Sequence, residues 1–174
     1  MNDIEAYLAN DDLKDFTIIL NNEKFKVHKM ILAARSSVFA EIIKNNPEVE
    51  EIKLTDIPTN IFKKVLDFIY FDIIPNSKND LIEIYDVAKK LKTKSLKNAI
   101  EKGLLKKLNN ENVFDLFLFA LKHKINDLKK ISIVRNQEIF PEMNFKNDLT
   151  EQFEELRKFS EINRIMKDLS EKLT

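Results

Sequence analysis

Glycine scarcity is the feature that most limits what this chain can build. The 174 residues contain a single glycine, Gly103. Loops that cradle phosphates need several glycines, because their backbone N–H groups must approach the phosphate closely or adopt positive φ angles. The chain therefore cannot carry a dinucleotide-binding fingerprint, a Walker loop, a glycine-rich kinase loop or a nucleophile elbow. We expect no enzyme of these classes and no cofactor.

Charge and cysteine content narrow the classes further. The 29 Lys and Arg residues balance 29 Asp and Glu residues, and the formal net charge is zero. Nucleic-acid-binding proteins usually carry a basic surplus, so we expect no nucleic-acid partner. The chain has no cysteine, which removes disulfides, thiolate metal sites and cysteine nucleophiles.

Apolar runs in this sequence are short. The longest spans residues 116–121, whereas a membrane-spanning helix needs roughly 20 apolar residues. The N-terminal residues are acidic and lack the apolar core of a secretion signal. We therefore expect a cytosolic or nuclear globular protein with no membrane partner.

Periodicity divides the chain into a mixed part and a helical part. Two strand-like runs, 15–20 and 23–28, flank Asn21-Asn22 and predict a β-hairpin with one buried face. Residues 51–55 predict a third strand. Helical periodicity predicts helices in the other segments: 3–10, 30–34, 38–43, 61–69, 80–93, 94–108, 113–121, 128–140 and 149–169. Ser36 or Ser37 is expected to cap the helix at 38–43. We predict an α+β domain at 1–108, with a small three-stranded sheet and clustered helices, followed by an all-α extension at 109–174.

Candidate chemical groups are few. The two histidines, His28 and His123, lie far apart and lack the spacing of metal ligands. We expect no catalytic or metal site, and we expect His28 to form hydrogen bonds at a strand end. Three phenylalanines, Phe114, Phe117 and Phe119, have no interleaved basic residues and indicate core or partner-facing surface. The lysines between 89 and 97 are expected to form a solubilising helix face.

Several ordered blocks resemble the signature of the BTB/POZ family, most closely its speckle-type members. The blocks are Asp15-Phe16-Thr17-Ile18, His28-Lys29, Ile31-Leu32-Ala33-Ala34-Arg35-Ser36-Ser37-Val38-Phe39, and the segments 52–57, 61–70 and 85–91. The resemblance implies a BTB/POZ fold followed by a short BACK-like helical extension. It also implies a protein-binding module rather than an enzyme. At Tyr70-Phe71-Asp72, relatives usually have Tyr-x-Gly, so here the turn must form without glycine.

Homodimerisation is a further implication of this resemblance. The family positions of the dimer interface correspond to four apolar side chains: Ile4, Tyr7, Leu8 and Ile31. The alternative is that these side chains cap the core of the monomer. Asp15 and Lys29 match a buried acid–base pair of some relatives, which predicts a structural ion pair.

Recruitment of a cullin-3 ubiquitin ligase scaffold is the function that the resemblance implies. Val49-Glu50-Glu51 fits the family's hydrophobic-x-Glu contact in composition, and the register places Pro47 at the hydrophobic anchor. The candidate cullin contacts are Pro47, Val49, Glu51 and Leu91. Two alternatives remain: a cullin-independent oligomerisation scaffold or transcription-associated module, and an inhibitor that forms mixed dimers with full-length adaptors. The assigned segments leave no room for a MATH or kelch module, so an unknown substrate or partner protein is expected to be recognised by other means.

Overall fold

The computed structural model describes Leu8 and residues 10–139. Its contacts divide the chain into two compact units, one ending at Lys107 and one beginning at Leu108. Ile4 and Tyr7 lie outside the described residues, as do Pro141 and the helix expected at 149–169. The assignment of the second unit as a BACK-like extension stays a prediction.

The first unit contains a three-stranded sheet with the strand order β2-β1-β3. β1 (Phe16–Leu20) pairs antiparallel with β2 (Glu23–Val27) and parallel with β3 (Glu51–Leu54). Between β1 and β2, Asn21 and Asn22 have φ angles of 48° and 67°. Left-handed angles at both central positions match the twist of a two-residue hairpin, and Asn tolerates them better than most residues. The predicted hairpin and third strand are confirmed.

One face of the sheet forms the core of this unit. Phe16, Ile18 and Leu20 of β1 are buried at alternate positions, as the period of a strand requires. On β2, Phe25 meets Phe62 edge to face, with ring centroids 5.3 Å apart. The helix that carries Phe62 therefore packs on this face of the sheet.

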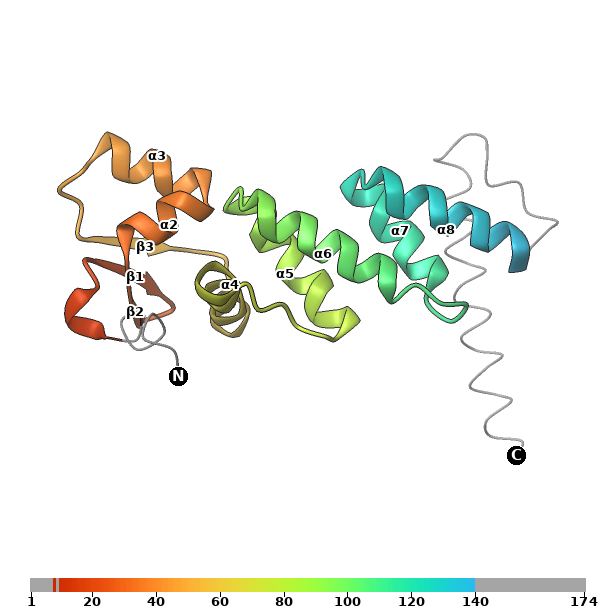
Figure 1. Ribbon diagram of the computed structural model, residues 1–174, viewed down its shortest axis with the longest axis horizontal. Coiled ribbons are helices and arrows are strands. Elements are labelled where there is room, and N and C mark those ends of the chain that lie inside the picture. Colours follow the sequence, from red (N-terminus) through yellow and green to blue (C-terminus); the bar gives the residue numbers. More distant parts are fainter. Residues whose placement is uncertain (1–7, 9, 140–174) are drawn as a thin grey trace, which may run out of the picture. The chain divides into compact units, whose positions relative to one another are not determined.

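In the described part of the first unit, five α-helices accompany the sheet: α2 (Lys29–Arg35), α3 (Ser37–Asn45), α4 (Thr59–Phe71), α5 (Lys78–Lys90) and α6 (Lys94–Lys106). Figure 1 shows α2 and α3 as a hairpin beside the sheet, with α4, α5 and α6 following one another away from it. Ser36 links α2 to α3. Its Oγ accepts a hydrogen bond from the Phe39 N–H and donates one to the Leu91 carbonyl, which confirms Ser36 as a helix cap.

The α5–α6 pair packs around a buried tyrosine. The Tyr85 hydroxyl donates to Glu101 Oε1 at 2.8 Å. Burial raises the pKa of Tyr85 well above its ordinary value, and the Glu101 carboxylate raises it further. Gly103 of α6 faces α5, because a Cβ added to it would lie 3.1 Å from Leu81 Cδ1 of that helix. The glycine thus allows close helix packing and serves no turn.

Left-handed backbone angles occur only at non-glycine residues in the described chain: Asn21, Asn22, Asp56, Asp72, Lys92 and Lys124. Asp72 follows the last residue of α4, with φ 56° and ψ 22°. Its carboxylate forms an ion pair with Arg35 at 2.9 Å. The turn after Tyr70-Phe71 is therefore built without glycine, as expected.

The second unit contains α7 (Val113–His123) and α8 (Asn126–Ile139) in its described part. Phe117 is buried at the centre of a cluster that includes Phe114 and Leu118. The aromatic residues of α7 are therefore core. On α8, by contrast, Ile131 and Val134 are exposed. With the sheet and helices of the first unit, these helices confirm the predicted α+β fold with a helical continuation.

Candidate protein-interaction surface

Asp15 and Lys29 meet at the beginning of α2, but not as a buried ion pair. The Asp15 Oδ1 atom accepts a hydrogen bond from the backbone N–H of Lys29 at 2.8 Å. The Lys29 ammonium instead donates to the Pro47 carbonyl at 2.9 Å, and Asp15 is exposed. The predicted pairing of charges is wrong: the carboxylate satisfies a free N–H group in the first turn of the helix, where negative charge is also favourable.

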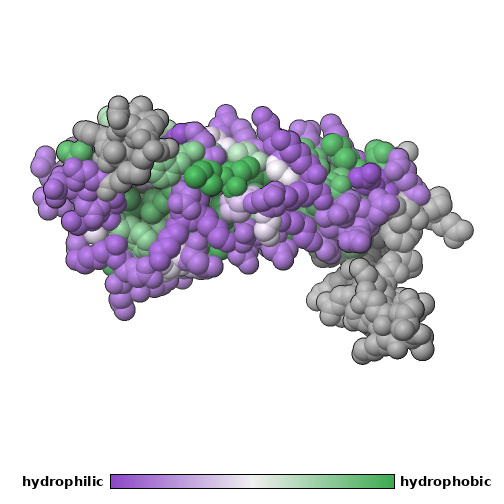
Figure 2. Space-filling view, turned by 60° about the horizontal axis from the view of Figure 1, so that its bottom comes forward, coloured by the Kyte–Doolittle hydropathy of each residue, from purple (hydrophilic) through white to green (hydrophobic). Residues whose placement is uncertain are grey.

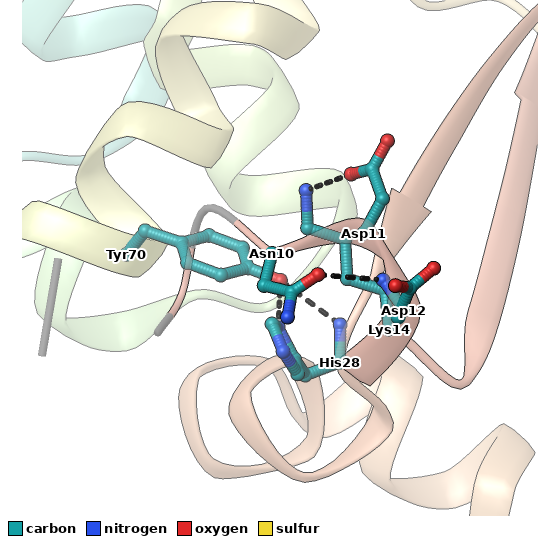
Figure 3. A network of polar contacts seen from close by, with 6 residues as sticks. All are labelled: Asn10, Asp11, Asp12, Lys14, His28 and Tyr70. Atoms are coloured by element: carbon teal, nitrogen blue, oxygen red, sulfur yellow. Dashed lines mark hydrogen bonds and ion pairs between the residues drawn. The ribbon is translucent and has the colours of Figure 1, made fainter. Parts of the chain in front are cut away.

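His28 joins the end of β2 to α4. The Tyr70 hydroxyl lies 2.9 Å from both the backbone nitrogen and the Nδ1 atom of His28, as Figure 3 shows. The hydroxyl oxygen accepts from the backbone N–H, which leaves its proton available to Nδ1. Burial raises the pKa of the Tyr70 phenol, so the hydroxyl keeps this proton at neutral pH. The expected hydrogen bonding of His28 is confirmed, and it is structural.

The segment that enters β1 is fixed by local polar contacts. It begins with a short 3-10 helix, η1 (Asp11–Leu13). Asn10 Oδ1 accepts from the Asp12 N–H at 3.1 Å, and Lys14 forms an ion pair with Asp11 at 2.7 Å. These contacts are drawn in Figure 3. They connect the short helix to the residues that lead into β1.

Apolar side chains are exposed at the same end of the unit. Met30 in the first turn of α2 is 79% exposed, and Leu13 of η1 is also exposed. The Asp15–Lys29 hydrogen bond brings their two segments together. Ile31 is half-buried. Apolar areas also interrupt the hydrophilic surface of this unit on the face shown in Figure 2.

Leu8 is the other predicted interface residue that the structure describes. It is half-buried and lines a hollow of about 620 Å³ together with Phe25 of β2 and Leu66 of α4. Leu8 thus lies beside a hollow that is lined by residues of its own chain. The assignment of Leu8 and Ile31 to a dimer interface stays a prediction.

The cullin candidates do not share one surface. Pro47 and Glu51 are exposed and Val49 is half-buried, in or beside the loop between α3 and β3. This loop is held by the Lys29–Pro47 bond and by the Thr17 N–H, which donates to the Glu50 carbonyl at 2.8 Å. Leu91, however, is only 2% exposed. Its selection as a partner contact is wrong, because its side chain belongs to the core.

Neither a metal-ligand cluster nor a membrane-spanning helix occurs among the described residues. No group of three or more His, Asp or Glu side chains is placed to hold a metal ion in this part of the chain. Within residues 10–139, no helix has the length and hydrophobicity needed to cross a membrane.

The sheet order, the α2–α3 hairpin and the packing of α4 are accompanied by a direct sequence match. The family model of the BTB/POZ domain matches residues 4–108, which is more than half of the 174-residue chain. The chain belongs to the BTB/POZ family. Domains of this family are protein–protein interaction modules.

Known BTB/POZ proteins resemble this chain over most of its length. The chain is 34% identical to BTB/POZ and MATH domain-containing protein 3 of Arabidopsis thaliana over 136 residues, which cover 66% of this chain and 32% of that protein. It is 28% identical to BTB/POZ and MATH domain-containing protein 4 of Arabidopsis thaliana over 144 residues, which cover 72% of this chain and 31% of that protein. The chain therefore matches about a third of the length of these relatives. Among solved structures, the BTB domain of human Gigaxonin aligns with a TM-score of 0.50 and 24% identity, covering 56% of this chain and 80% of that one, which shows the fold alone.

Two surface features of this BTB/POZ domain were missed by sequence reasoning. Met30 precedes the buried Leu32 by two positions, so the helical period places it on the side of α2 away from the core. That signal was present in the sequence. Tyr70, in contrast, lies 42 residues from His28, and no local pattern indicates that the two meet.

Proposed function

We propose that the chain is a homodimeric adaptor that recruits a cullin-3 ubiquitin ligase scaffold. The observation that carries the dimer is the exposure of Met30, at 79%, on the first turn of α2. Met30 lies next to Ile31, and Leu13 is exposed two residues before Asp15, whose carboxylate accepts from the Lys29 N–H. Membership of an interaction family supports a protein partner for this surface.

A second copy of the chain is the occupant that fits this end of the domain. Twofold association brings the same patch of each copy together, so a self-complementary apolar surface is buried without a different partner. Of the predicted contacts, Ile31 lies beside Met30 on α2 and Leu8 is half-buried, whereas Ile4 and Tyr7 lie outside the described residues.

The loop between α3 and β3 supplies the proposed cullin contact. Pro47 and Glu51 are accessible, and Val49 is partly so. Because the Lys29 ammonium holds the Pro47 carbonyl, the loop is fixed against the same helix that carries Met30. A fixed loop loses little conformational entropy when a partner binds.

The test compares cullin-3 binding by three forms of the chain. The double variant Val49→Ala/Glu51→Ala is expected to bind the N-terminal part of cullin-3 about tenfold more weakly by calorimetry, a loss of about 1.4 kcal/mol. Glu41→Ala, a change on the exposed side of α3, is the matched control and should bind like the wild type. A wild-type chain that forms dimers but does not bind cullin-3 would contradict the proposed adaptor function and favour a cullin-independent scaffold. Capture of a full-length relative in mixed dimers would instead favour an inhibitor.

A further inference from the structure

We propose that a basic hollow between the α2–α3 corner and the α5–α6 connection binds an anionic peptide segment of a partner protein. The hollow has a volume of about 540 Å³, within the range of ligand-binding pockets. Its polar lining comes from three cations, three serines and an amide: Arg35, Lys92, Lys94, Ser36, Ser37, Ser95 and Asn98. No carboxylate lines it, although the chain as a whole has as many acidic as basic residues.

The two lysines are the cations available to a ligand. Arg35 is already paired with Asp72 at 2.9 Å. Lys92 and Lys94 are exposed, and the ammonium group of neither forms a hydrogen bond or ion pair with a residue described by the structure, although the Lys92 backbone N–H donates to the Lys89 carbonyl. Their positive charges are therefore not neutralised locally, and an anionic ligand can reach both.

Nearby lysines of the same stretch behave differently. Lys90 donates to the Thr55 carbonyl at 3.0 Å, and Lys97 lies 3.7 Å from the Glu101 carboxylate. The stretch that the sequence predicted as one solubilising face thus contains lysines with internal partners and a pair that faces the hollow. Only Lys92 and Lys94 of this stretch contribute to the lining.

Backbone donors add to the charge of the hollow. α6 begins directly after Thr93, whose side chain forms no capping hydrogen bond. The N–H groups in the first turn of α6, where Ser95 lies, therefore have no side-chain cap. Free N–H groups at a helix start favour negative charge, so they act in the same direction as the two lysines.

An acidic peptide suits this site better than a nucleic acid does. Nucleic-acid binding relies on many neutralised phosphates, whereas this hollow offers two free lysines in a chain of zero net charge. Three alanines, Ala33, Ala34 and Ala40, complete the lining. Their small side chains leave room for a peptide backbone to approach. The anionic groups could be carboxylates or phosphates, which share this chemistry.

The site is separate from the surfaces of the proposed function. Its lining includes none of the dimer candidates and none of Pro47, Val49 and Glu51. If anionic peptides do not bind this hollow, the proposed dimerisation and cullin binding are unaffected. If the chain does not dimerise or bind cullin-3, the proposed anionic site is likewise unaffected.

The experiment measures fluorescence anisotropy of labelled peptides with the full chain. The probes are a peptide of alternating Asp and Ser, its Asn counterpart and its phosphoserine counterpart. We expect the two anionic peptides to bind and the Asn peptide not to bind. Lys92→Glu/Lys94→Glu should weaken binding about tenfold or more, whereas Lys89→Glu/Lys102→Glu, the same charge change at exposed positions outside the lining, should keep it within about twofold.

A second variant separates binding from folding. Lys92→Gly removes one cation and also relieves the left-handed φ of 50° at this position, so it is expected to melt no lower than the wild type while binding more weakly. Preference for the phosphoserine peptide would support the site and identify phosphate as its ligand. Equal losses in both double variants, no binding of either anionic peptide, or tighter binding of a single-stranded oligonucleotide would each overturn the proposal.

Discussion

The α5–α6 hairpin of the first unit and the α7–α8 hairpin of the second end their first helices in the same way. The Thr93 N–H returns to the Ala88 carbonyl at 2.9 Å, and the Ile125 N–H returns to the Ala120 carbonyl, also at 2.9 Å. Each bond spans five residues and belongs to a Schellman motif, which satisfies carbonyl groups at a helix C-terminus.

Both motifs place lysine where glycine is the usual residue. Lys92 and Lys124 have φ angles of 50° and 57°. A left-handed conformation costs a residue with a Cβ roughly 1–2 kcal/mol. Two hairpins with one backbone solution show that a chain with a single glycine can close its turns at a modest cost in stability.

The surroundings of the two turns differ. At the first turn, Ser36 donates to the Leu91 carbonyl and Lys90 to the Thr55 carbonyl, so two distant segments hold it through polar contacts. Near the second turn, Ile125 is buried, and on α8 the hydroxyl of Ser132 is buried without a hydrogen-bond partner in the described chain. Both turns are therefore flanked by a buried apolar residue, Leu91 or Ile125, and the first is also held by polar contacts from two distant segments.

Replacing the buried serine of each unit by alanine gives the largest expected contrast. Ser36 is 1% exposed and Ser132 is fully buried, so the chemical change is matched. Ser36→Ala should lower the free energy of unfolding by about 2 kcal/mol, because it removes a helix cap and leaves the Leu91 carbonyl without its partner. Ser132→Ala should be neutral or raise it by up to about 1 kcal/mol, because an unsatisfied hydroxyl disappears. Urea denaturation of both variants measures the difference, and equal effects would contradict the contrast.

Tyr85→Phe tests the polar contact within the α5–α6 hairpin. Loss of its hydrogen bond to Glu101 should lower the free energy of unfolding by about 1 kcal/mol at neutral pH. Because the folded chain raises the pKa of Tyr85, its contribution is complete below the ordinary value of 10.0 and is lost as the pH rises through the folded pKa. The stability of the wild type should therefore fall more steeply above about pH 10 than that of the variant. Parallel pH profiles in circular dichroism melts would contradict the shift.

Glycine at the two left-handed lysines gives the smallest expected effect. Lys92→Gly and Lys124→Gly should each raise the free energy of unfolding by about 0.5–1 kcal/mol, because relief of the left-handed strain exceeds the added entropy of the unfolded chain. The helical control Lys102→Gly should lower it by about 1 kcal/mol. Denaturation midpoints distinguish these signs. A loss of stability at only one turn would show that its lysine side chain makes a contact that the backbone motif does not require.

The sequence predicted most elements because their signals are local. The β-branched and aromatic residues of 15–20 and the alternation of 23–28 are sufficient for the hairpin, and Ser36 and Ser37 mark a helix start by their capping chemistry. The helical period of α5 also indicates that Leu91 is buried, because it follows the buried Ile84 and Ala88 at spacings of seven and three residues. The resemblance to the family, in contrast, selected Leu91 as a partner contact without indicating that its side chain points into the core.

The contacts of the candidate surface were harder to predict because they join distant segments. Asp15 and Lys29 are adjacent in the fold, as the resemblance implied, yet a carboxylate can bind either the ammonium or the backbone N–H of a lysine. The structure shows the backbone bond, with the ammonium on Pro47. Residue types alone do not decide between these arrangements, since both satisfy the carboxylate.

The oligomeric state in solution tests the proposed adaptor most directly. Light scattering of the purified chain should give twice the chain mass of 20.5 kDa, and Met30→Asp should shift it toward the monomer, because a charge cannot be buried cheaply in an apolar interface. Ile73→Asp, at another exposed apolar position, is the matched control and should stay dimeric. A wild-type chain that remains monomeric at high concentration would contradict the interface at Met30 and Ile31.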